Sequence, residues 1–114
     1  MKSGIKNEDP KNFDKKRLLL LFNKIIKQIE KKPYGYFKFK KMRGFCGVCE
    51  WEEGIKLDYR KPVIPTLIHE ILHDLYPDNK EEWVLRLESK ITQVVSSKDL
   101  FNLMRCFLSK LEIN

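Results

Sequence analysis

The sequence predicts an α+β fold with an N-terminal helix, a small antiparallel three-stranded sheet, and a central helix followed by two further helices. Three observations support this prediction. Apolar residues recur at helical spacing near the N-terminus, they alternate with polar residues between positions 34 and 59, and helical spacing returns from position 66 onward. The chain has 114 residues, 42% of them hydrophobic, which is enough for one domain with its own core.

Residues 1–12 are mostly polar and predict a flexible tail ahead of a single domain spanning residues 13–114. Asp14 is a suitable N-cap for the first helix, and Pro33 ends it because the residue before a proline is disfavoured in the helical region. One side of this helix is apolar and carries Leu18, Leu21, Phe22, Ile25, Ile26 and Ile29.

Three short segments with the two-residue period of strands follow, at residues 34–42, 45–51 and 55–59. Turn signals separate them at Arg43-Gly44 and at residues 52–54. Consecutive strands joined by short turns predict an antiparallel meander.

Pro62 and Pro65 mark the link to the central helix, which is apolar on most sides from Thr66 to Leu75 and is therefore expected to be buried. Residues 77–79 end it. A third helix is expected from about Lys80 to the break at residues 96–97, and residues 99–111 predict the last helix.

The sharpest functional signal is the motif at residues 69–73, His-Glu-Ile-Leu-His. His69 and His73 are four residues apart, so they lie on one side of a helix and can bind one metal ion, for which zinc is expected at one per chain. Glu70 is expected to act as a general base that takes a proton from the attacking water and gives it to the leaving amine. The chain has two histidines, and both lie in this apolar helix, where burying them without a role is costly.

A catalytic zinc ion needs a third protein ligand and one open position. Since no third histidine exists, a carboxylate on the helix after Pro77 must serve. Helical spacing favours Glu81, which shares the edge of the apolar side with Glu88, whereas Glu82 points away. Glu88 and Glu82 stay open as alternatives, and acidic residues in a first helical turn are also common because they interact favourably with the helix dipole.

Residues 66–91 resemble minimal gluzincin-type zinc metallopeptidases, including small proteins of this kind in phage and prophage genomes. The resemblance is carried by Thr66-Leu67-Ile68-His69-Glu70, Leu72-His73, Tyr76-Pro77-Asp78, Glu81-Glu82-Trp83-Val84 and Leu87. A more distant resemblance is to the ImmA/IrrE peptidases, in which apolar residues follow the ligand glutamate at three and six positions. Glu81, Val84 and Leu87 have that spacing, although the interval after the histidine motif is much shorter here.

This resemblance implies a zinc-dependent peptidase that cleaves a protein or peptide substrate in the cytoplasm, that of the host cell if the protein is phage-encoded. It also implies a strand edge beside the active helix, where an extended peptide can add to the sheet. Ile55, Leu57 and Tyr59 are the expected substrate-binding residues of that edge. Tyr59, Arg60 and Tyr76 are candidates for stabilising an oxyanion.

A second interpretation is a catalytically silent binding module that contacts nucleic acid through its basic surface. The net charge is +7, with 23 basic against 16 acidic side chains, which favours anionic partners. The lysines are scattered and form no compact basic block, so nucleic acid is not the favoured partner.

Cys46 and Cys49 form a C-x-x-C pair without the second pair that a four-ligand zinc site requires, so incidental thiols are expected. Three cysteines in all fit a reducing compartment better than a disulfide framework. No secretory signal and no apolar segment long enough to span a membrane is visible, so the sequence predicts a cytoplasmic protein without membrane contact.

Overall fold

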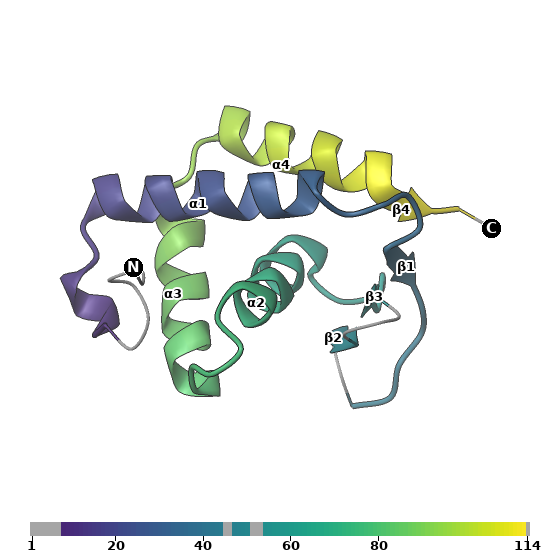
Figure 1. The fold of residues 1–114 in the computed structure, drawn as a ribbon, viewed down its shortest axis with the longest axis horizontal. Helices are drawn as coiled ribbons and strands as arrows, with labels where there is room; N and C mark the ends of the chain where they lie inside the picture. The colour runs from purple at the N-terminus through teal and green to yellow at the C-terminus, as the bar shows by residue number, and fades with distance from the viewer. Residues whose placement is uncertain (1–7, 45–46, 51–53, 114) are drawn as a thin grey trace.

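The computed structural model describes residues 8–44, 47–50 and 54–113, with the backbone alone for residues 47–50. Helices α1 and α4 lie side by side, α2 and α3 lie beneath them, and a small sheet closes one end of the molecule (Figure 1). Within the described ranges, no helix has the length and apolarity needed to cross a membrane. The elements in chain order are a 3-10 turn at Pro10–Asn12, α1 at Lys15–Glu30, β1 at Phe37–Phe39, β2 at Gly47–Glu50, β3 at Gly54–Leu57, α2 at Val63–Leu75, α3 at Glu81–Val94, α4 at Ser97–Lys110 and β4 at Leu111–Glu112.

Helix boundaries follow local capping chemistry. The predicted N-cap of α1 is confirmed, since the Asp14 carboxylate accepts a hydrogen bond from the Arg17 amide at 2.9 Å. Helix α4 begins two residues earlier than predicted, because Ser96 and Asp99 form a reciprocal capping box. Helix α2 also begins earlier than predicted, at Val63, so Pro65 lies in its first turn. Proline is tolerated there because backbone amides of the first turn have no hydrogen-bond acceptor within the helix.

The prediction of an antiparallel three-stranded sheet is wrong. The sheet has four strands in the order β2-β3-β1-β4, and β1 runs parallel to both of its neighbours. Antiparallel pairing is confined to β2 and β3. After β1 the chain forms the antiparallel β2–β3 hairpin. The second strand of this hairpin, β3, lies beside β1 and runs in the same direction, and β2 lies on the far side of β3. Alternation of apolar and polar residues specifies which face of a strand is buried, but not which strand lies next to it.

A glycine permits the close approach of β3 to β1. Gly54 has a φ of +100°, and a Cβ atom there would lie 2.1 Å from the Tyr36 carbonyl oxygen. The next amide, that of Ile55, donates a hydrogen bond to the same oxygen at 2.9 Å. A side chain at position 54 would therefore push the two strands apart.

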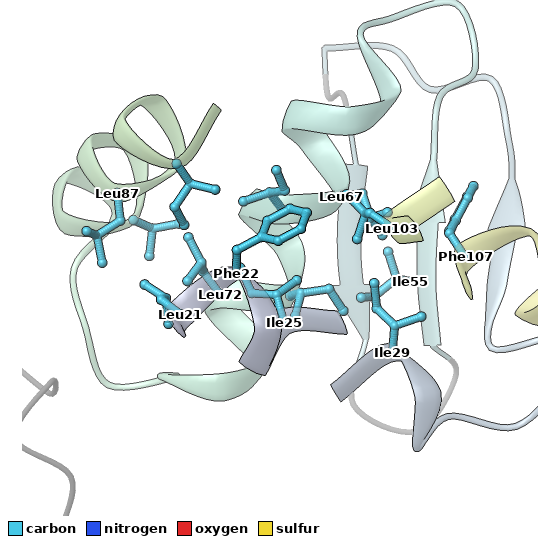
Figure 2. Packing of buried hydrophobic residues seen from close by; sticks show 14 of the residues in the cluster. Leu21, Phe22, Ile25, Ile29, Ile55, Leu67, Leu72, Leu87, Leu103 and Phe107 are labelled. Atoms are coloured by element: carbon cyan, nitrogen blue, oxygen red, sulfur yellow. The ribbon is translucent and has the colours of Figure 1, made fainter. Parts of the chain in front are cut away.

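Helix α2 lies at the centre of the hydrophobic core, as predicted. Leu67, Ile68, Ile71 and Leu72 have no exposed surface. Apolar side chains of α1 contact α2 and α3 at one end of the core, where Phe22 lies near Leu72, and they reach the sheet at the other (Figure 2). Removing a large side chain from such a core typically costs about 2–5 kcal/mol, so α2 is firmly placed.

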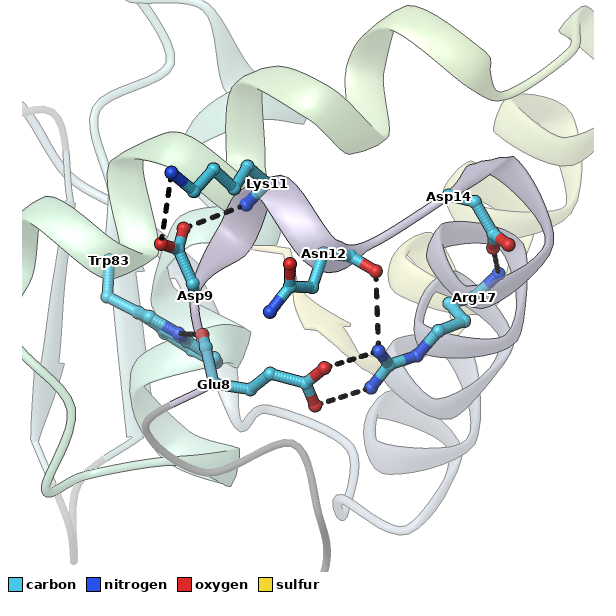
Figure 3. Close-up of polar contacts among 7 residues, drawn as sticks. All are labelled: Glu8, Asp9, Lys11, Asn12, Asp14, Arg17 and Trp83. Carbon is cyan, nitrogen blue, oxygen red and sulfur yellow. Dashed lines mark hydrogen bonds and ion pairs between the residues drawn. The ribbon is translucent and has the colours of Figure 1, made fainter.

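Residues 8–12, which the sequence assigns to a flexible tail, contact α1 and α3 (Figure 3). The Glu8 carboxylate receives two hydrogen bonds from the Arg17 guanidinium, at 2.5 and 2.7 Å. The Trp83 indole N–H of α3 donates to the Glu8 carbonyl oxygen at 2.7 Å. This segment thus links the start of α1 to the start of α3.

Candidate metal centre

Three side chains from α2 and α3 converge at one point. Helix α2 carries His69 and His73 on the same side, and the short turn at residues 76–80 brings the first residue of α3, Glu81, opposite them. One Glu81 carboxylate oxygen lies 2.7 Å from His73 Nε2, and the other lies 3.0 Å from His69 Nε2. The three donor atoms all lie within 4.8 Å of one another.

These three groups fit a zinc ion. Zinc bound tetrahedrally at about 2.0–2.1 Å holds its ligand atoms about 3.3 Å apart, close to the separations of the Glu81 oxygens from the two ring nitrogens. Two imidazoles with one carboxylate are also a donor set typical of catalytic zinc. The exposed fractions of the side chains are 13% for His69, 27% for His73 and 60% for Glu81, so solvent and a substrate can reach the site.

Glu88 contacts the opposite nitrogen of one of these histidines. Its carboxylate lies 2.9 Å from His69 Nδ1, whereas Glu81 faces Nε2. This hydrogen bond is the main cause of a raised His69 pKa, which burial opposes. With the proton on Nδ1, the ring presents the Nε2 lone pair toward Glu81 and is held in that orientation. Glu88 therefore orients the ring of His69, a candidate ligand, and it does not occupy the position of Glu81 between the two histidines.

Glu82, the other alternative third ligand, points away from the site. Its carboxylate pairs with Arg86 of the same helix at 3.3 Å, and both side chains are largely exposed. The helical spacing that separates Glu82 from Glu81 in the sequence is thus kept in the structure.

Glu70 is buried beside the two histidines, with 8% of its surface exposed. Burial is the main cause that raises the pKa of its carboxyl group above the ordinary value. The neighbouring His69 and His73 oppose that rise, whereas the negative charges of Glu81 and Glu88 add to it. A carboxylate whose pKa is raised toward neutrality is a better proton acceptor at the pH of the cell.

Contacts with α1 and with Lys32, which follows it, fix the end of α2 that carries His73. The nearly buried Asp74 carboxylate accepts a hydrogen bond from Gln28 at 2.8 Å and pairs with Lys32 at 2.9 Å. Lys24 donates to the Tyr76 hydroxyl at 2.8 Å. These contacts were not predicted from the sequence, where their only signal is the four-residue spacing of Lys24, Gln28 and Lys32. They occupy Asp74 and also Tyr76, one of the oxyanion candidates.

The three predicted substrate-binding residues do not form an exposed strand edge to which a substrate could add. Ile55 and Leu57 have no exposed surface and belong to the core. Strand β3 lies between β2 and β1, so it is not the edge of the sheet. Tyr59 is 48% exposed, but it follows the strand and its ring contacts Phe39. The assignment failed because the strand order of the sheet differs from the predicted meander.

Of the three cysteines, Cys106 is the one whose side chain the structure describes. The side chains of Cys46 and Cys49 lie outside the described residues. Cys106 is a free, half-buried thiol that faces the Ile26 carbonyl oxygen, and burial is the main cause of its raised pKa. A thiol with a raised pKa forms little thiolate and is a poor nucleophile at neutral pH.

Substitution of the three glutamates is expected to lower zinc affinity in a definite order. Glu81→Gln should cause the largest loss because it replaces the carboxylate between the two histidines by a neutral amide, which is a much weaker zinc ligand. Glu88→Gln should weaken binding by about 10–100-fold, as is usual for a residue that orients a ligand. Glu82→Gln is the matched control and should leave affinity unchanged. Competition titration against a zinc-binding dye measures all three, and equal affinities in the Glu81 and Glu82 variants would exclude Glu81 as a ligand.

Comparison with known proteins gives no match that could assign this site independently. The two histidines of α2 and the glutamates beside them are therefore the basis for a functional conclusion. No protein-family model, curated protein or solved structure matches the chain.

Proposed function

We propose that this protein is a zinc-dependent metallopeptidase that hydrolyses peptide bonds of a protein substrate in the cytoplasm. The observation that carries the proposal is the convergence of His69, His73 and Glu81, with donor atoms within 4.8 Å, at a position open to solvent. A zinc ion held there would supply a Lewis acid and would lower the pKa of a bound water to about 7. The resemblance of residues 66–91 to minimal gluzincin-type peptidases supports the same reaction.

Each residue of the site has a separate role in this proposal. His69, His73 and Glu81 bind the metal ion, and Glu88 orients the His69 ring through Nδ1. Glu70 accepts a proton from the attacking water and passes it to the nitrogen of the leaving amine. Its burial beside the histidines supports this role, because the raised pKa brings its proton affinity closer to what such a transfer needs.

The substrate strand is proposed to bind at β2 instead of β3. Strand β2 is the end strand of the sheet and contacts α2, the helix that carries the histidines. Within the described residues, β3 is the strand paired with β2, so the other edge of the β2 backbone offers amide and carbonyl groups. An extended peptide can add to such an edge through main-chain hydrogen bonds, which places it next to the active helix.

Metal removal tests the proposed function. The purified protein is expected to contain about one zinc per chain and to cleave an unfolded protein such as casein. Treatment with 1,10-phenanthroline should abolish cleavage, and added zinc should restore it. The isomer 1,7-phenanthroline, which cannot chelate, is the control and should have no effect. Cleavage that survives complete removal of zinc, verified by elemental analysis, would exclude a zinc peptidase.

A further inference from the structure

A concentration of positive charge lies at the ends of β1 and β3, in residues that are not part of the candidate metal centre. We call residues 38–43 and 58–61 together the basic–aromatic face. These ten residues contain one carboxylate, Asp58, and six cationic side chains, whereas the whole chain has 23 basic and 16 acidic residues. The six are Lys38, Lys40, Lys41, Arg43, Arg60 and Lys61.

Hydrogen bonds hold the two segments of this face together. The Lys40 amide donates to the Leu57 carbonyl oxygen at 2.8 Å, and the Met42 amide donates to Asp58 Oδ2 at 2.9 Å. Arg60 Nη2 reaches back to the Met42 carbonyl oxygen at 3.3 Å. The cations are thus carried on a fixed backbone frame, and a ligand that binds them need not first order a loose loop.

The single carboxylate of this face does not offset its charge toward solvent. The Asp58 side chain is fully buried and accepts hydrogen bonds from the Arg60 guanidinium at 2.7 and 3.0 Å. Lys38 lies 3.6 Å from Glu112. In the described part of the chain, no side chain pairs with Lys40, Lys41, Arg43 or Lys61.

Two partly exposed aromatic rings belong to the same two segments. Phe39 is 40% exposed and Tyr59 is 48% exposed, and their ring centroids lie 5.8 Å apart in an edge-on arrangement. Phe39 also lies 6.1 Å from Phe107 of the core, which restricts its movement. Partly exposed aromatic rings on segments whose cations have no partner among the described residues are suited to a ligand that is both flat and anionic.

We propose that the basic–aromatic face binds single-stranded nucleic acid. Lys40, Lys41 and Arg43 would contact the phosphates, and Phe39 and Tyr59 would stack on unpaired bases. Bases in a duplex stack on one another and offer no free face to these rings, so the single strand is the favoured form. None of these residues belongs to the metal centre, so this binding activity is independent of the proposed peptidase.

Binding of fluorescent oligonucleotides measured by anisotropy tests this proposal. Oligomers of about 16 nucleotides, oligo-dT for DNA and oligo-U for RNA, cover the usual site size. Lys40→Ala with Lys41→Ala is expected to weaken binding and to reduce the slope of log affinity against log salt by about 2. The matched control is Lys16→Ala with Lys27→Ala, which removes the same charge from exposed positions of α1.

The aromatic pair is tested separately because charge alone would bind any polyanion. Tyr59→Leu should weaken binding about tenfold, the effect expected for one stacked base. Phe101→Leu, at a ring of α4 that is 63% exposed, should leave it unchanged. Circular dichroism establishes that each variant is folded. Tight binding of either DNA or RNA with these losses supports the proposal.

Three results would overturn it. The first is an equal loss of affinity in the variants of the face and in the control variants. The second is equal affinity for duplex and single-stranded oligonucleotides. The third is competition by polyglutamate that is as strong as competition by unlabelled oligonucleotide. The last would show that the face binds acidic protein segments, while failure of the peptidase assay would leave this test unaffected.

Discussion

Glu70→Gln is expected to lose cleavage by a factor of at least about 10²–10⁴ while keeping its zinc. Glutamine has nearly the same size as glutamate but cannot accept the proton of the attacking water. Because Glu70 is not among the three converging donors, the metal site should remain complete. Cleavage rate and zinc content are measured on the same samples, with an unstructured protein as substrate.

Glu82→Gln is the control for this experiment, since it makes the same chemical change at an exposed position of α3. Its activity should equal that of the native protein. A Glu70→Gln protein that cleaves at the native rate would exclude the mechanism. Loss of both zinc and activity would instead assign Glu70 to the metal site.

His69→Ala and His73→Ala are each expected to abolish stoichiometric zinc binding. Two remaining donors cannot hold zinc tightly against buffer. His69→Ala should also leave the Glu88 carboxylate without the ring that it contacts at 2.9 Å. Elemental analysis after dialysis measures the metal, and the native protein treated in parallel is the control. Full zinc content in either variant would show that the metal binds elsewhere.

The convergence of the three candidate metal ligands could be predicted from the sequence because it is local. His69, His73 and Glu81 lie on two consecutive helices joined by a short turn, so helical periodicity alone places them on facing sides. The same periodicity groups Glu88 with Glu81 at one edge of α3. It does not specify which ring nitrogen each carboxylate meets, because that depends on how α3 is placed against α2.

The sheet could not be predicted in the same way because its pairings are not local. Strand β4, at Leu111–Glu112, pairs with β1 more than seventy residues earlier, and two residues after a helix carry no strand pattern of their own. The alternation of residues 55–59 identified a strand but not its place inside the sheet. Since the substrate edge follows from strand order, that part of the site was misplaced along with the sheet.

The closeness of the proposed ligands in the sequence has a consequence for folding. His73 and Glu81 are eight positions apart, so a zinc ion joining them would close a very short loop. The entropy that such a cross-link removes from the unfolded chain grows with the logarithm of loop length, so it is less here than for a link between distant elements. The apolar core, which draws on all four helices and the sheet, holds the fold without it. Unlike a zinc finger, which unfolds without its metal, this protein should stay folded when the proposed zinc ion is removed, so that the supply of metal would control the proposed peptidase activity without unfolding the chain.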